Sequence, residues 1–264
     1  MNSSFYIGAT GLRAQQSALD IVSNNLANLN TNAFKRSSVV FAELVSPPSQ
    51  PNGTQEVELP GKTLGTAAPG GLGVSVVDLP KVLAAGDYKK TDGSMDVAIR
   101  GAGFIELLGQ NGETLLWRGG TLKVSRDGLL TAASGTPVKG VSPLPPRTQQ
   151  LRIDEQGRVF ALASGTTASR QIGQIELVSA LNASALEAQG EGIYKVREHQ
   201  TELVRARPGE QGLGTVAQGY IEGSNVNITE EMVSLMWIQR SYGANARVIQ
   251  AADELMGMTN SLKR

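Results

Sequence analysis

The chain of 264 residues contains no cysteine and a single histidine, and each scarcity excludes a kind of chemistry. Without cysteine there is no disulfide, no thiolate nucleophile and no zinc–thiolate site. His199 stands alone among polar residues, whereas a metal site needs several ligands at suitable spacing. We therefore expect no metal and no cofactor, and we interpret His199 as a surface residue.

The chain also has no excess of positive or negative charge and no long apolar run. Lys and Arg number 24, Asp and Glu number 24, and the formal net charge is zero. A neutral chain without a basic run has no global attraction for nucleic acid or an anionic membrane. No stretch of about 18 apolar residues is present, so we expect no membrane insertion. The N-terminus also lacks the pattern of a cleaved secretory signal.

Catalytic motifs are absent as well. The chain has neither a phosphate-binding P-loop nor a Gly-x-Ser-x-Gly nucleophile turn. Gly101 and Gly103 precede an expected strand, whereas a dinucleotide site needs a helix N-terminus there. Asp92 and Asp96 stay open as an acid–base pair, although Asp beside a Gly turn is expected on conformational grounds. We expect a protein without catalytic residues.

The N-terminal segment combines apolar residues at seven-residue spacing with very little charge. Phe5, Leu12, Leu19 and Leu26 form the series, and Arg13 and Asp20 are the only charges in the first 34 residues. Seven-residue spacing is typical of a helix that buries one stripe against a partner helix. The uncharged remainder favours contacts on further sides. The alternative is a plain amphipathic helix at the edge of a globular domain.

The C-terminal segment predicts a second, longer helix. Its apolar series runs at the same spacing through Ile228, Leu235, Tyr242, Ile249 and Met256. The preceding Asn227 is a helix-capping residue, and Glu230 and Glu231 suit the positive end of the helix dipole. About 34 residues at about 1.5 Å each give a helix of roughly 50 Å, which indicates a coiled coil or a polymer core.

The middle of the chain has a different character. Five prolines between Pro47 and Pro69 predict an extended connecting arm. Short runs of alternating apolar residues separated by Asp-Gly and Asn-Gly turns then predict an all-β body. The expected strands cover 74–77, extended by 81–83, and 95–100, 104–108, 151–153, 158–162, 171–178, 193–196 and 201–204. The fold class is α+β, with segments 1–36 (first helix), 37–73 (arm), 74–222 (β body) and 223–264 (last helix).

Three groups of residues, at both ends and in the middle of the chain, form a recognisable pattern. The first group is Ser23-Asn24-Asn25-Leu26-Ala27-Asn28 with Thr31-Asn32-Ala33-Phe34-Lys35-Arg36, and the second is Asp96 to Phe104. The third is Gly219-Tyr220-Ile221-Glu222 with Ser224-Asn225-Val226-Asn227, continued by Glu230-Glu231-Met232-Val233 and Gln239-Arg240-Ser241-Tyr242. Together these groups resemble bacterial flagellar rod and hook proteins, the axial family of the flagellum. Chain length and the start Gly8-Ala9-Thr10-Gly11-Leu12 resemble most the members that build the distal rod. The proximal-rod members are the alternative, and hook members are longer.

The resemblance implies a structural subunit that stacks into a hollow axial tube. The paired terminal helices would form its inner core, and the β body would lie outside. The implied partners are other copies of the chain, other rod proteins, the hook protein and the surrounding ring proteins. The subunit would leave the cell unfolded through the flagellar export apparatus and sit in the rod that crosses the periplasm.

The heptad series and the resemblance together predict a self-assembly core. Its expected members are Phe5, Leu12, Leu19, Val22, Asn25, Leu26, Asn28, Ile228, Leu235, Tyr242, Ile249 and Met256. An alternative from another class is a glycan-binding or glycan-cleaving β domain with oligomerising ends. Such a protein needs aromatic side chains for sugar stacking, and aromatic residues make up only 5% of this chain.

Overall fold

The computed structural model describes residues 2–45, 71–109, 112–146, 148–163, 169–197 and 201–262. These residues form two compact units. The helical unit comprises Met1–Ser23, Val39–Leu79 and Met232–Arg264, and the β unit comprises Asn24–Ser38 and Pro80–Glu231. The fold class is therefore α+β, as the sequence predicts.

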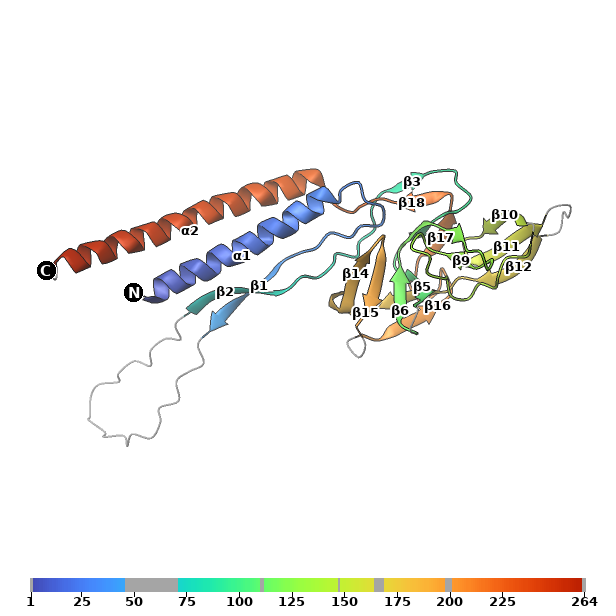
Figure 1. Cartoon of the computed structure of the whole chain (residues 1–264), viewed down its shortest axis with the longest axis horizontal. Helices are drawn as coiled ribbons and strands as arrows, with labels where there is room; N and C mark the ends of the chain where they lie inside the picture. The colour runs from blue at the N-terminus through green and yellow to red at the C-terminus, as the bar shows by residue number, and fades with distance from the viewer. Residues whose placement is uncertain are drawn as a thin grey trace, which may run out of the picture. The chain divides into compact units, whose positions relative to one another are not determined.

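Two long helices and a strand pair make up the helical unit. Helix α1 spans Asn2–Ala27 and helix α2 spans Ile228–Leu262, so each begins in one unit and ends in the other. The helices lie side by side in opposite directions (Figure 1). Strand β1 (Val40–Val45) pairs antiparallel with β2 (Gly71–Asp78), and Gly73 of β2 lies directly against Thr10 of α1.

Each helix boundary has a local cause. Helix α1 ends at Ala27, where asparagines begin to compete for backbone hydrogen bonds, and Asn28 Nδ2 donates to the carbonyl of Asn24 at 2.9 Å. Helix α2 begins after Asn227, whose Oδ1 accepts a hydrogen bond from Thr229 N at 3.0 Å. The cap predicted from the sequence is confirmed.

The β unit consists of several short antiparallel sheets. The largest has the strand order β14-β15-β6-β5-β13-β16, and smaller sheets have the orders β10-β11-β12, β17-β4-β7, β18-β3 and β8-β9. The strands are β3 (Tyr88–Lys90), β4 (Asp96–Arg100), β5 (Phe104–Leu108), β6 (Thr114–Trp117), β7 (Gly119–Thr121), β8 (Lys123–Val124), β9 (Leu130–Thr131), β10 (Thr148–Ile153), β11 (Arg158–Ala163), β12 (Ser169–Gln174), β13 (Leu177–Ala180), β14 (Leu186–Gly190), β15 (Ile193–Val196), β16 (Leu203–Ala206), β17 (Thr215–Gln218) and β18 (Tyr220–Glu222). A 3-10 turn, Ala183–Ala185, precedes β14.

Two strand predictions need correction. Lys81 does not extend β2; it forms an isolated bridge with Ser37 instead. The run 171–178 is two strands, because the chain leaves β12 after Gln174 and joins a different sheet as β13. A run of apolar residues at strand spacing cannot reveal a change of sheet, since the pattern describes each strand and not its neighbours.

The core of the β unit is built around Trp117. This side chain is 1% exposed and packs in one cluster with residues from several sheets, including Ile99, Leu107, Ile175 and Val216. A smaller cluster lies around Phe104 and Tyr194, whose rings meet edge to face with centroids 5.5 Å apart. The small sheets thus share a common apolar interior.

We expect Trp117→Ala to lower the free energy of unfolding of the β unit by about 3–5 kcal/mol, because it leaves a large cavity. Urea titration followed by circular dichroism measures the change. The matched control is Leu108→Ala in the neighbouring strand, whose side chain is 50% exposed and should cost less than about 0.5 kcal/mol. Equal losses in both variants would contradict this account of the core.

Candidate assembly site

The predicted assembly residues fall into three classes of exposure. Val22 and Asn25 are buried within the single chain. The half-buried members are Phe5, Leu12, Leu19, Leu26, Asn28, Leu235, Ile249 and Met256. Ile228 and Tyr242 are exposed. Most of the predicted assembly residues are therefore partly exposed to solvent in the single chain.

The buried face of α1 is made of small residues that the sequence prediction did not include. Gly8, Gly11, Ala14 and Ala18 are the buried positions of its first turns. A Cβ atom at Gly8 would lie 2.7 Å from Cγ1 of Ile249, and one at Gly11 would lie 2.9 Å from Nδ2 of Asn245. The two glycines therefore permit a close approach of the helices that no larger residue allows. Their spacing of three residues places both glycines on the same face of the helix, and this is the sequence signal for the close contact.

Helix α2 exposes much of its apolar surface. Among the described residues its exposed large side chains include Trp237, which is 68% exposed, together with Met232, Val233, Met236, Tyr242, Val248, Leu255 and Met258. Extended exposed apolar patches mark interaction surfaces. This surface is therefore a candidate for contact with a molecule outside the single chain.

The roots of both helices, the parts inside the β unit, are joined by hydrogen bonds. Asn25 Nδ2 donates to Glu231 Oε2 at 3.3 Å and to the carbonyl of Ser37 at 3.0 Å, and its Oδ1 accepts from Ser37 N at 2.9 Å. Arg36 Nη1 lies 3.4 Å from carboxylate oxygens of both Glu230 and Glu231. The end of α1 and the start of α2 are thereby tied to the strand-like segment that follows α1.

Next to these roots lies a buried charged triad formed by Lys35, Arg118 and Glu222. All three side chains are about 1% exposed. Glu222 Oε1 lies 2.5 Å from Lys35 Nζ, and Glu222 Oε2 lies 2.7 Å from Arg118 Nε. The triad joins the segment after α1, the turn after β6 and the end of β18, which are far apart in the sequence.

Backbone groups satisfy the remaining polar atoms of the triad. Lys35 Nζ donates to the carbonyl of Ala84 at 2.7 Å, and Arg118 donates to the carbonyls of Gly101 and Gly103. Both glycines have positive φ angles, near 116° and 119°, which favour glycine. The glycine pair that does not form a nucleotide site thus positions two acceptors for Arg118.

Burial sets the electrostatics of the triad. It lowers the pKa of Lys35, the charge of Arg118 lowers that pKa further, and the hydrogen bond and charge of Glu222 act in the opposite direction. Burial also raises the pKa of the nearby Tyr194 phenol. Two cations share one buried anion, so the triad depends on Glu222 more than on either partner.

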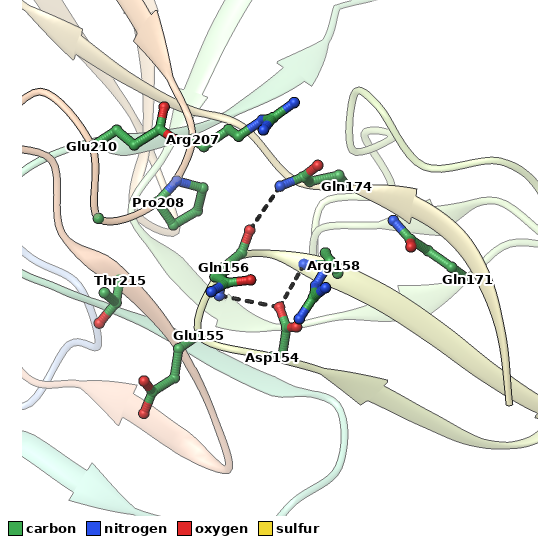
Figure 2. Close-up of a pocket in the computed structure, with 11 residues that line it drawn as sticks. Asp154, Glu155, Gln156, Arg158, Gln171, Gln174, Arg207, Pro208, Glu210 and Thr215 are labelled. Carbon is green, nitrogen blue, oxygen red and sulfur yellow. Dashed lines mark hydrogen bonds and ion pairs between the residues drawn. The ribbon is translucent and has the colours of Figure 1, made fainter.

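A polar pocket in the described part of the β unit shows no catalytic arrangement. It is a polar hollow of about 960 Å³ lined by residues of 154–158, 171–174 and 207–215 (Figure 2). Asp154 accepts hydrogen bonds from Gln156 N and Arg158 N and pairs with Arg158 Nε at 2.7 Å. Burial raises the pKa of Asp154, but these hydrogen bonds outweigh that effect and hold the pKa below its usual range. Asp154 is therefore an ionised structural carboxylate.

Asp92 and Asp96 have different partners. Asp96 accepts hydrogen bonds from the hydroxyls of Thr91 and Thr121, each at 2.7 Å, whereas Asp92 pairs with Lys90 at 3.0 Å. His199 lies outside the described residues. Among the residues that are described, no three His, Asp or Glu side chains form a group that could hold a metal ion, and no helix is long and apolar enough to cross a membrane.

Two long terminal helices with an exposed apolar face, rooted in a β unit by buried charges, define a self-assembling structural subunit. Three segments match family models: the flagellar basal body rod protein at 5–35, the D1 domain of flagellar hook protein FlgE/F/G at 98–161, and the C-terminal part of the basal body rod FlgEFG proteins at 217–262. Lys35, Arg118 and Glu222 come one from each segment. The chain belongs to the flagellar basal-body rod protein family.

Full-length relatives support this assignment. The flagellar basal-body rod protein FlgG of Buchnera aphidicola subsp. Schizaphis graminum is 35% identical, over 99% of this chain and 100% of its own. FlgG of Borreliella burgdorferi is 31% identical, over 100% of both chains. The basal-body rod protein FlgF of Caulobacter vibrioides is 27% identical, over 97% of this chain and 95% of its own. The protein is a structural subunit of the flagellar rod.

We expect Glu222→Gln to destabilise the β unit by about 3–5 kcal/mol, because it leaves Lys35 and Arg118 buried without a counter-ion. Urea titration at neutral pH measures the loss. Glu187→Gln serves as the control, since it breaks the Arg197–Glu187 pair, whose side chains are 50% and 44% exposed, and should cost less than about 1 kcal/mol. A Glu222 variant as stable as the Glu187 variant would show that the triad does not hold the unit together.

Proposed function

We propose that this protein builds the distal rod of the flagellum, the hollow shaft that passes torque to the hook. The similarity to FlgG proteins over the whole chain supports this placement, and the weaker similarity to a FlgF protein keeps the proximal rod as the alternative. The proposed partners are other copies of the chain, neighbouring rod proteins, the hook protein and the surrounding ring proteins.

The observation that carries the proposal is the exposed apolar surface of α2. Several large side chains along one helix face solvent in the single chain, and Trp237 is among them. Burial of apolar surface stabilises association at roughly 25 cal/mol per Å² before the costs of ordering. A subunit stacked into a tube would cover this surface with the helices of its neighbours.

We further propose that α1 and α2 pair as an antiparallel coiled coil that forms the inner wall of the tube. The half-buried positions of α2 include Leu235, Ile238, Asn245 and Ile249, at steps of three, seven and four residues; Tyr242, the seam position between Ile238 and Asn245, is exposed in the single chain. The predicted assembly residues on both helices would be covered when copies stack. The β unit would then form the outer wall, and the buried triad would transmit torque between the helix roots and that wall.

We propose that the connecting arm remains a separate segment of the chain and takes part in the contacts between subunits. Strand β1 lies in the segment predicted as the arm (37–73), strand β2 begins there and continues past residue 73, and residues 46–70 of the arm lie outside the described residues. Val77 of β2 and Phe41 of β1 are exposed apolar residues of this pair. We propose that they contact a neighbouring subunit.

We expect Leu19→Ala and Leu235→Ala each to block tube formation while the β unit stays folded. Each half-buried leucine would lose about 2 kcal/mol of packing, at the lower end of the range for buried leucine, and the loss recurs in every subunit. Electron microscopy and sedimentation of the purified chain measure assembly, and circular dichroism measures folding.

The control for this experiment is Leu181→Ala, because Leu181 lies on the β unit and is 70% exposed. It should leave assembly and folding unchanged. Motility of cells carrying each variant as their only copy provides the second readout. Normal tubes and normal motility with both helix variants would contradict the proposed inner wall, and a wild-type chain that never forms tubes would contradict the proposed function.

A further inference from the structure

Each helix carries a second seven-residue series, and every residue of this series is exposed in the single chain. On α1 the positions are Tyr6, Ala9, Arg13, Gln16, Asp20, Ser23 and Ala27. On α2 they are Val233, Trp237, Arg240, Ala244, Arg247, Ala251, Glu254, Met258 and Ser261. Both series alternate steps of three and four residues, which is the spacing of a coiled-coil seam. We define these positions as the outer seam of each helix.

The outer seams hold charges that have no ion-pair partner in the described chain. Arg13 and Asp20 of α1 and Arg247 and Glu254 of α2 are exposed, and none of them takes part in an ion pair among the described residues. Arg13 and Asp20 are also the only two charges of α1. Charges at seam positions are costly unless they meet an opposite charge. Their placement therefore restricts which helix can cover them.

The charges of one seam complement those of the other in opposite chain directions. Arg13 and Asp20 are seven residues apart, and so are Arg247 and Glu254 with the signs in reverse order. An antiparallel alignment that places Asp20 opposite Arg247 also places Arg13 opposite Glu254. A shift by one heptad in one direction pairs Asp20 with Arg240 but sets Arg13 against Arg247, and a shift in the other direction sets Asp20 against Glu254. Only one register pairs both charges.

The same register sets a small residue against a larger one in two layers of the seam. It places Ala9 opposite Met258 and Gln16 opposite Ala251, and it places the small residues Ser23 and Ala244 opposite each other. Large residues facing small ones is the arrangement in which two helices interdigitate. In an antiparallel coiled coil, an a position of one helix faces a d position of the other. Arg13 and Asp20 occupy one of these two heptad positions on α1, and Arg247 and Glu254 occupy the other on α2. A parallel arrangement would not bring these charges into the same layers.

This register cannot form within one chain. The intramolecular contacts place Gly8 beside Ile249 and Gly11 beside Asn245, so Asp20 lies near the level of Trp237. Arg247 is ten residues, or about 15 Å along the helix, from that level. The occupant of the outer seam must therefore come from another molecule, and charge complementarity identifies it as a second copy of this chain.

We propose that the outer seam of α1 in one copy docks antiparallel on the outer seam of α2 in the next, with Asp20 paired to Arg247 and Arg13 paired to Glu254. This inference rests on the proposed function and specifies the contact between neighbouring subunits. The two ion pairs set the axial offset between copies. Tyr6, Ala9, Ala251 and Met258 are apolar residues of the overlapping seams, whereas Val233 and Trp237 lie beyond the level of Ala27 in this register.

Charge exchange tests the pairing. Asp20→Arg and Arg247→Asp should each raise the critical concentration for polymerisation by at least about tenfold, because like charges then meet in a buried layer. The double variant Asp20→Arg with Arg247→Asp restores the opposite charges and should return the critical concentration to within about twofold of wild type. Arg240→Asp is the matched control, since the proposed register places Arg240 opposite Ala27, and it should change little.

Cross-linking tests the register, because the chain has no cysteine of its own. The double variant Gln16→Cys with Ala251→Cys should form disulfide-linked ladders of copies in assembled rods. The control, Gln16→Cys with Ala244→Cys, is one heptad out of register and should not. Ladders from the control alone, or charge variants that polymerise like wild type, overturn the register while leaving rod assembly intact. A wild-type chain that forms no rods overturns the proposed function itself.

Discussion

The burial of two cations around a single carboxylate is the constraint on which the β unit and both helix roots depend. Glu222 receives Lys35 and Arg118, and each cation finds its remaining acceptors on backbone carbonyls. Such a triad contributes little stability beyond what apolar residues would give, but the loss of one member leaves a buried charge without its counter-ion. The Asn25–Glu231 and Arg36–Glu231 contacts beside it extend this set of polar contacts to the helix roots.

Much of the fold was predictable because its signals are local. The apolar runs at 95–100 and 104–108 and the capping residue Asn227 are local signals, and the structure has strands at Asp96–Arg100 and Phe104–Leu108 and a cap at Asn227. The triad was not predictable, because its three residues come from segments far apart in the sequence. No local sequence pattern indicates that these segments lie together. A single charge within an apolar or glycine-rich run, as at Arg118 and Glu222, was the one available hint. The change of sheet after Gln174 was hidden for a similar reason.

The helices show the same division between pattern and packing. Seven-residue spacing correctly indicated long helices at both ends. The same spacing predicted the large apolar residues Leu12 and Leu19 as members of the helix contact. The intramolecular contact instead falls on Gly8 and Gly11, because backbones that approach closely leave no room for larger side chains. Large residues are thereby left half-buried or exposed on the remaining faces. A series of this kind identifies the helix reliably, and the side that faces its own partner is set by the smallest residues.

The position of Glu222 in the chain has a consequence for the order of events during synthesis. Lys35 and Arg118 emerge from the ribosome well before the carboxylate that neutralises them, and strands β3 and β4 emerge before their partners β18 and β17. Until residues 215–222 have been made, two sheets lack an edge and two cations lack their anion. A nascent chain of this protein therefore cannot complete its body early, and remains open until nearly its whole length is available.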